Sequence, residues 1–271
     1  MKIGVYQCAA GGRSQEERLA CLAEALGDDG PDIVVCPELF SSGYNIGDDL
    51  LRLAEPVEGP FFQEIAKLTA KSGSLIVYGY PEKLEGELYN AAAAVSPEGV
   101  LIANHRKQAN SPNSFETAYF STGKRPTAFT YKGVRVALVI CYEVEFPETV
   151  RAAAQAGAQL VLAPTALVDR WEVVATKMIP TRAFENGIYL AYANHGGSEN
   201  GFSYYGGSRI VAPDGTEPAV AGSGEDLIVA EFDAERVRAA QERLPYLKDV
   251  SGLELSASGK HEAANVRKPV F

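Results

Sequence analysis

Short apolar runs recur along this chain, and they constrain its fold more than any other feature. Residues 32–36 read DIVVC, residues 134–140 read VRVALVI and residues 160–163 read LVLA. Strands that are apolar without alternation are typical of a sheet that is covered on both faces. Helical stretches separate these runs, so the sequence predicts an α/β protein built in layers.

The hydrophobic pattern predicts where the elements lie. We expect strands over residues 3–7, 32–36, 75–80, 88–95, 100–105, 134–140, 160–163, 189–194, 204–211 and 227–232. We expect helices over residues 14–26, with Ser14 as the N-cap, and over 61–72, 147–156 and 173–186. Because no linker or internal repeat interrupts this series, residues 1–271 are predicted to form one domain. From about residue 244 the segment LPYLKDV and the end RKPVF read as an irregular tail.

Charge and composition exclude several classes of protein. The formal net charge of -10 argues against nucleic-acid binding, which needs a basic surface. No run approaches ~18 apolar residues, so we expect neither a transmembrane helix nor membrane binding. The N-terminal residues alternate in polarity and do not resemble a signal peptide. The spacing of the four cysteines matches no zinc site or disulfide framework, so we expect no metal and a reduced, cytoplasmic setting.

Three reactive side chains follow the ends of predicted strands: Glu38, Lys107 and Cys141. Each alone has an ordinary explanation, since a cysteine after an apolar strand is more often a small core residue. Together they supply a thiol nucleophile, a carboxylate that can take its proton and an ammonium that can stabilise an oxyanion. His105 and His195 offer a competing cysteine–histidine pair, but the local signatures of papain-like enzymes are missing.

The segments around these residues resemble the nitrilase, or carbon–nitrogen hydrolase, superfamily. VVCPELFSSGYNIGD is similar to the glutamate motif, HRKQ to the lysine motif and VALVICYEVEFPE to the cysteine motif. The resemblance implies Glu38 as general base, Lys107 as the catalytic lysine and Cys141 as nucleophile. It also implies a second glutamate, Glu116 in SFETAYFSTG, that orients Lys107 or the substrate. The segments ELFSSGYNIG and VYGYPE are most similar to aliphatic amidases of the 5-aminopentanamidase type.

The resemblance also carries expectations for the reaction and the fold. It implies a four-layer αββα sandwich, assembly into a homodimer or a higher homo-oligomer, and no cofactor. Tyr142 after the nucleophile favours an amide over a nitrile, because nitrilases usually carry tryptophan at that place. We therefore expect hydrolysis of a small aliphatic amide to a carboxylic acid and ammonia through a thioester. One departure concerns Lys107, after which the family's usual histidine and leucine are missing.

Residues that follow the strand ends are candidates for the wall of a substrate pocket. They are Tyr44, Tyr142, Glu143, Phe146, Thr165, Ala166, Trp171 and Asn194. Glu143 has two interpretations, namely a partner for a substrate amine and a structural partner for an arginine such as Arg151 or Arg182, and we favour the second.

Three alternatives remain at this point. An N-carbamoyl amine or amino-acid hydrolase and a nitrilase would both use the same triad of side chains. A binding or regulatory protein that retains the triad but has little catalysis is the third, supported by the altered lysine motif.

Overall fold

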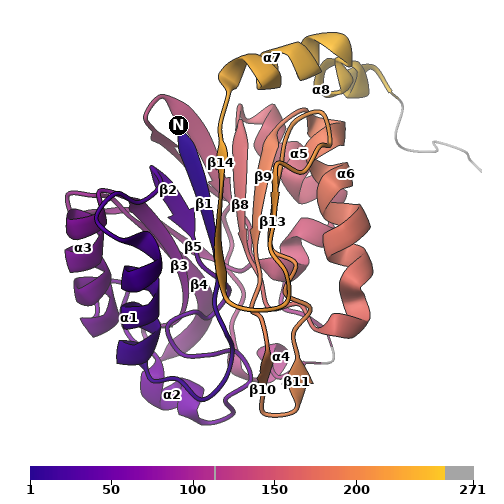
Figure 1. Cartoon of the computed structure of the whole chain (residues 1–271). Helices are drawn as coiled ribbons and strands as arrows, with labels where there is room; N and C mark the ends of the chain where they lie inside the picture. The colour runs from indigo at the N-terminus through magenta and orange to yellow at the C-terminus, as the bar shows by residue number, and fades with distance from the viewer. Residues whose placement is uncertain (113, 254–271) are drawn as a thin grey trace, which may run out of the picture.

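Two sheets pack face to face in the computed structural model, which describes residues 1–112 and 114–253 (Figure 1). The strand order of the first sheet is β14 (Asp226–Glu231), β1 (Lys2–Gln7), β2 (Ile33–Val35), β3 (Leu75–Leu84), β4 (Glu87–Val95) and β5 (Leu101–Arg106). The order of the second is β13 (Ala219–Val220), β12 (Arg209–Val211), β9 (Tyr189–Ala193), β8 (Leu160–Pro164), β7 (Val134–Leu138) and β6 (Thr127–Tyr131).

Helices cover the outer face of each sheet and complete the predicted αββα sandwich (Figure 1). The first sheet is covered by α1 (Gln15–Leu26) and α3 (Pro60–Ser72), and the second by α5 (Pro147–Gln155) and α6 (Ile179–Asn186). The central core lies between the sheets, where Val35 and Val77 belong to one cluster with Leu138 and Leu162. Burial on both faces explains why these strands are apolar throughout.

Helix α1 shows how the sequence sets an element boundary. The Ser14 hydroxyl accepts a hydrogen bond from the Glu17 N–H, and the Glu17 carboxylate accepts one from the Ser14 N–H. This reciprocal pair satisfies N–H groups that have no partner inside the helix, so the helix begins after Ser14 as predicted.

The sheets position the site through their parallel strands. Strands β1, β2 and β3 run parallel, as do β7, β8 and β9. The loops after β2, β8 and β9 meet, because the Glu38 N–H donates to the Thr165 carbonyl oxygen and His195 bonds the Glu38 carbonyl oxygen. The carboxyl ends of the parallel strands in both sheets thus lie together.

Several predicted boundaries are wrong. The strand expected over 204–211 is confined to β12, because Gly206 and Gly207 have φ angles of 67° and 59° that interrupt an extended chain. The helix expected over 173–186 begins as a π-helix at Val174–Met178, and α6 follows it. Pro180 near that junction has no N–H to donate to the preceding turn.

Other elements escaped the sequence analysis. They are β6, β13, the short pair β10 (Ser198–Glu199) and β11 (Phe202–Ser203), and the helices α2 (Asp49–Leu53), α4 (Glu116–Tyr119) and α7 (Ala234–Arg243). The segment LPYLKDV is not irregular, since it contains helix α8 (Tyr246–Asp249). The end RKPVF lies outside the described residues. Within the described chain, no helix combines the length and the apolarity that a membrane span requires.

Candidate active site

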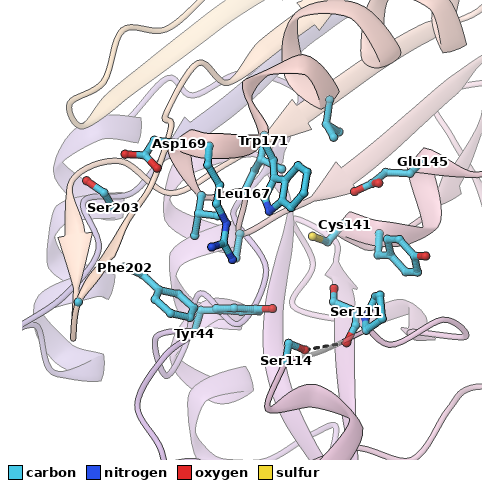
Figure 2. A pocket seen from close by; sticks show the side chains of 17 residues that line it. Tyr44, Ser111, Ser114, Cys141, Glu145, Leu167, Asp169, Trp171, Phe202 and Ser203 are labelled. Atoms are coloured by element: carbon cyan, nitrogen blue, oxygen red, sulfur yellow. Dashed lines mark hydrogen bonds between the residues drawn. The ribbon is translucent and has the colours of Figure 1, made fainter.

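Cys141 lies at a sharp turn where the chain leaves β7. Its backbone φ angle is 51°, in the left-handed region that a residue with a side chain seldom adopts. A 3₁₀ helix, Cys141–Glu145, begins at the same residue. The turn places the cysteine side chain against a cavity of about 670 Å³ (Figure 2). Backbone strain of this kind often accompanies a functional side chain.

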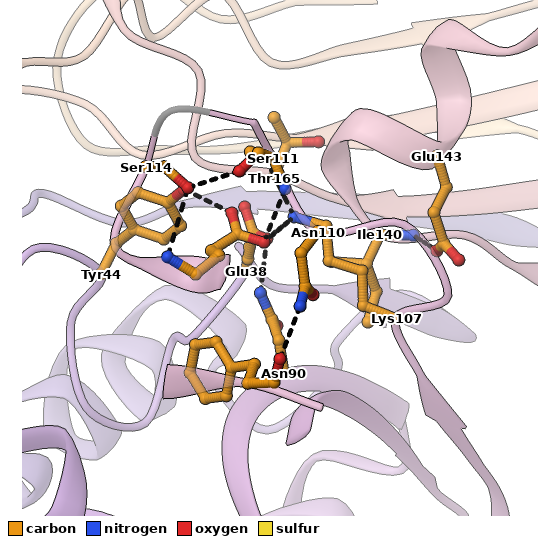
Figure 3. Close-up of polar contacts among 12 residues, drawn as sticks. Glu38, Tyr44, Asn90, Lys107, Asn110, Ser111, Ser114, Ile140, Glu143 and Thr165 are labelled. Carbon is orange, nitrogen blue, oxygen red and sulfur yellow. Dashed lines mark hydrogen bonds and ion pairs between the residues drawn. The ribbon is translucent and has the colours of Figure 1, made fainter. Parts of the chain in front are cut away.

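Lys107 joins two carboxylates in the interior (Figure 3). Its Nζ donates to Glu38 Oε1 and to Glu116 Oε2, both at 2.7 Å, and all three side chains are fully buried. The lysine backbone is fixed as well, because its N–H donates to the Asn90 carbonyl and its carbonyl accepts from Gly123. The structure therefore brings together Glu38, Lys107 and Glu116, as the sequence predicts.

Each carboxylate has a further donor. Asn90 Nδ2 donates to Glu38 Oε1 at 2.7 Å, and the Tyr44 hydroxyl donates to Glu116 Oε1 at 2.5 Å. The second oxygen of Glu38, Oε2, has no hydrogen-bond partner among the described residues. One carboxylate is thus saturated by donors, whereas the other keeps an oxygen that can accept a proton.

Burial and the neighbouring charges set the protonation states. Burial raises the pKa of Glu38 to about 7, although Lys107 acts in the opposite direction. The pKa of Glu116 is lowered, because Lys107 and the Tyr44 hydroxyl outweigh its burial. Burial and the nearby Glu38 raise the pKa of the Cys141 thiol well above its usual value. The resting cysteine is therefore a thiol and needs a base before it can attack.

Five predicted residues line the cavity: Tyr44, Cys141, Tyr142, Ala166 and Trp171. In Figure 2 Tyr44 and Trp171 extend into the space that the Cys141 sulfur faces. Sequence analysis missed the rest of the wall, which includes Ser111, Glu145, Asp169 and Arg170.

Four other predicted pocket residues do not line this cavity. Asn194 bridges the backbone of Leu167 and the Gly206 carbonyl. Thr165 is buried and bonds through its backbone to Ala193 and Glu38. Phe146 packs its ring edge-on against Tyr142, with ring centroids 4.9 Å apart.

Glu143 is the fourth predicted pocket residue that does not line the cavity. The prediction that it pairs with an arginine is also wrong. Its carboxylate accepts hydrogen bonds from His105 Nε2 at 2.9 Å, from the Ile140 N–H at 2.6 Å and from the Gln108 N–H at 2.8 Å. In Figure 3 its side chain lies apart from the Glu38 carboxylate. Glu143 thus ties the turn before Cys141 to the loop after Lys107.

Those contacts explain how the loop holds its place without the missing histidine and leucine. Gln108 is fixed by Glu143, and the Asn110 side chain donates to the Phe120 carbonyl at 2.7 Å. Ser111 donates its N–H to Glu116, and its hydroxyl lies 3.4 Å from Lys107 Nζ. Of these loop residues, Ser111 bonds the proposed catalytic groups directly, while Gln108 and Asn110 hold the loop in place.

Sequence reasoning missed Asn90 as a site residue and considered His195 only as a base for the cysteine. Asn90 lies inside β4, where nothing in the alternation marks it. His195 bonds the Glu38 carbonyl oxygen at 2.7 Å, and burial lowers its pKa to about 4, so it stays neutral. No group of three or more His, Cys, Asp or Glu residues within 1–112 and 114–253 is arranged to hold a metal ion.

Comparison with known proteins extends over nearly the whole chain. The model of the family described as "Carbon-nitrogen hydrolase" matches residues 5–242. A "Hydrolase in pqqF 5'region" of Pseudomonas protegens is 38% identical over 92% of this chain and 88% of its own length. An "(R)-stereoselective amidase" of Pseudomonas sp. is 36% identical over 92% of this chain and 91% of its own.

A solved structure provides a comparison of the folds. The amidase from Nesterenkonia sp. AN1 superposes with a TM-score of 0.80 at 30% identity, covering 90% of this chain and 98% of that one. That structure is a variant with acrylamide joined to the active-site cysteine by Michael addition.

Proposed function

The chain belongs to the carbon–nitrogen hydrolase family, and from this premise we propose that it is an amidase whose nucleophile is Cys141. The observation that carries the assignment is the buried Glu38–Lys107–Glu116 arrangement next to a cysteine on the wall of a cavity. The substrate is a small aliphatic amide, which is hydrolysed to a carboxylic acid and ammonia.

The first half of the reaction forms a thioester. Glu38 takes the proton of the Cys141 thiol through its unpaired oxygen, and the thiolate attacks the amide carbonyl carbon. Lys107 and the Tyr142 N–H stabilise the resulting oxyanion. The intermediate collapses, the C–N bond breaks, and the nitrogen leaves as ammonia with the proton that Glu38 had received.

The second half regenerates the thiol. Glu38 takes a proton from water, and the hydroxide attacks the thioester carbonyl. The C–S bond breaks, the acid product leaves, and the sulfur recovers its proton from Glu38. Glu116, which bonds both Lys107 and Tyr44, acts by holding the lysine in position.

We further propose that the enzyme resembles the 5-aminopentanamidase type in its substrate. The segments ELFSSGYNIG and VYGYPE support this assignment, and the apolar side chains of the pocket suit an alkyl chain. Assembly as a homodimer or higher homo-oligomer and a cytoplasmic setting complete the proposal. N-carbamoyl amines and nitriles are the competing substrates.

An ammonia-release screen with Cys141→Ala tests the assignment. The wild type should release ammonia from short aliphatic amides faster than from N-carbamoyl amines or nitriles of equal chain length. Cys141→Ala should release none, whereas Cys21→Ala, which changes a half-buried cysteine in α1, should keep wild-type rates. Mass spectrometry of the wild type should find the acyl group on Cys141. Normal turnover by Cys141→Ala would refute the mechanism, and a wild type inactive on every substrate would favour a binding protein.

A further inference from the structure

The pocket next to Cys141 carries charges that the proposed mechanism does not use. We infer that the Glu145 carboxylate binds an ammonium group on the acyl chain, so that the enzyme prefers aliphatic amides that carry a positive charge. This inference rests on the proposed function and assigns the residue of the same site that recognises the charged end of the substrate.

Two carboxylates and one guanidinium contribute to the cavity wall. The carboxylates are Glu145 and Asp169, and the guanidinium is Arg170. In Figure 2 Glu145 lies on the Cys141 side of the cavity and Asp169 on the opposite side. Arg170 lies over the Trp171 ring, 5.7 Å from its centroid, so an aromatic face already stabilises its charge. A cationic substrate therefore meets a wall with an excess of negative charge.

The Glu145 carboxylate has no hydrogen bond or ion pair with any of the described residues, unlike Glu38 and Glu116. The nearby Arg182 is already occupied. It donates to the backbone carbonyls of Val144 and Glu145, at 3.1 and 2.7 Å, and to the Glu185 carboxylate. A half-buried carboxylate with no partner lies at a site where a ligand cation gains an ion pair.

The protonation of Glu145 agrees with this geometry. Burial raises its pKa, and the opposing charges of Lys107 and Arg182 do not compensate fully. A bound ammonium supplies the missing positive charge and lowers that pKa again.

The location of Glu145 fits a substrate contact. It ends the 3₁₀ helix that Cys141 begins, so one rigid turn fixes the distance between the carboxylate and the nucleophile. Leu167, Val168 and Val174 supply apolar surface in the same cavity. An alkyl chain with a carbonyl at one end and an ammonium at the other would place the carbonyl at Cys141, the chain on the apolar wall and the ammonium at Glu145.

The test compares matched pairs of amides. We would measure kcat and KM for 4-aminobutanamide, 5-aminopentanamide and 6-aminohexanamide against butanamide, pentanamide and hexanamide. In the wild type, kcat/KM should favour the amino amide in at least one pair. Glu145→Gln should reduce that preference by about tenfold, the equivalent of about 1.4 kcal/mol, mainly through KM. Glu148→Gln, which changes an exposed carboxylate in the first turn of α5, should leave the preference unchanged.

Three results would overturn the proposed role of Glu145. A wild type that hydrolyses alkyl amides without preferring any amino amide overturns it while leaving the amidase assignment intact. A preference that survives in Glu145→Gln also overturns it. If that variant does not fold, competition in the wild type decides, because pentylammonium should inhibit pentanamide hydrolysis more strongly than 1-pentanol does. Equal inhibition by the two compounds would reject a cation site.

Discussion

Replacing Lys107 by methionine removes the cation that two buried carboxylates share. Both Nζ–Oε distances are 2.7 Å, and water reaches none of the three side chains. When one partner of a buried ion pair is removed, the remaining charge is left uncompensated, at a cost of about 3–5 kcal/mol. Total stability of a domain is about 5–15 kcal/mol, so Lys107→Met should lose a large part of its free energy of unfolding.

Lys67→Met is a matched control for this change. Lys67 Nζ lies 2.7 Å from Glu64 Oε1, the same distance as in the buried pairs, but both side chains are more than half exposed. A surface pair of this kind contributes about 0–1 kcal/mol, because water and salt screen it. A larger loss of stability in Lys107→Met than in Lys67→Met is therefore due to the burial of the ion pairs.

The loss should depend on pH in a defined direction. Lys107 lowers the pKa of Glu116 in the wild type, so the stabilisation from that carboxylate is present above its unfolded pKa and disappears as pH falls. Glu38 contributes in the opposite direction, because its raised pKa of about 7 lets the folded wild type take up one proton as pH falls. Without Lys107, burial and mutual repulsion raise the pKa of both carboxyls. The folded variant then binds more protons than the unfolded chain, and its stability rises as pH falls toward the unfolded pKa. The difference in free energy of unfolding between the wild type and Lys107→Met should therefore become smaller from pH 8 to pH 5.

Urea denaturation at one protein concentration measures the effect at each pH. The double variant Lys107→Met with Glu116→Gln should recover part of the loss, because one uncompensated charge is removed. If Lys107→Met at pH 8 loses no more stability than Lys67→Met, the buried charges are not ionised as we describe. A difference in free energy of unfolding that grows toward pH 5 would contradict the pKa shifts that we describe for Glu38 and Glu116.

Two further predictions concern activity and the support of the turn. The pKa of about 7 for Glu38 predicts that kcat/KM for an amide rises with pH through neutrality, as the base loses its proton, and a flat profile from pH 5 to 8 would exclude Glu38 as the group that limits the rate. Glu143→Gln should lower the free energy of unfolding by about 1–3 kcal/mol and also reduce kcat, because an amide cannot accept all three hydrogen bonds that the carboxylate receives. Unchanged urea midpoints and kcat would show that Glu143 does not support the turn.

The strands that carry the proposed catalytic residues were predictable from sequence for a physical reason. Strand β2, which leads to Glu38, is buried throughout, and β7, which leads to Cys141, is buried except at Arg135, so each is an apolar run whose end is visible. Strand β5, which leads to Lys107, is only partly buried and gives a weaker signal. Strand β6 and helix α7 were missed because they lie at the margin of the fold. Only Phe129 is buried in β6, and only Val237 and Ala240 are buried in α7, which leaves a weak periodic signal.

Supporting residues are harder to predict, because their partners are distant in sequence. Asn90 bonds Glu38 across 52 residues, and His105 bonds Glu143 across 38. No local pattern records either contact, since the first depends on how strands of one sheet are arranged and the second on how the two sheets pack together. His105 was considered only as a base for the cysteine, yet it is bonded to Glu143 and Thr127.

The two glutamates after Cys141 show where sequence reasoning ends. It identified Glu143 as a candidate for the pocket, whereas the structure directs Glu145 there and ties Glu143 to the backbone behind the turn. A 3₁₀ helix has about three residues per turn, so side chains two positions apart cannot share a face. Which glutamate faces the substrate is therefore decided by how the turn starts, and the positive φ angle of Cys141 sets that start. The same backbone feature that directs the thiol into the cavity also selects the carboxylate that accompanies it.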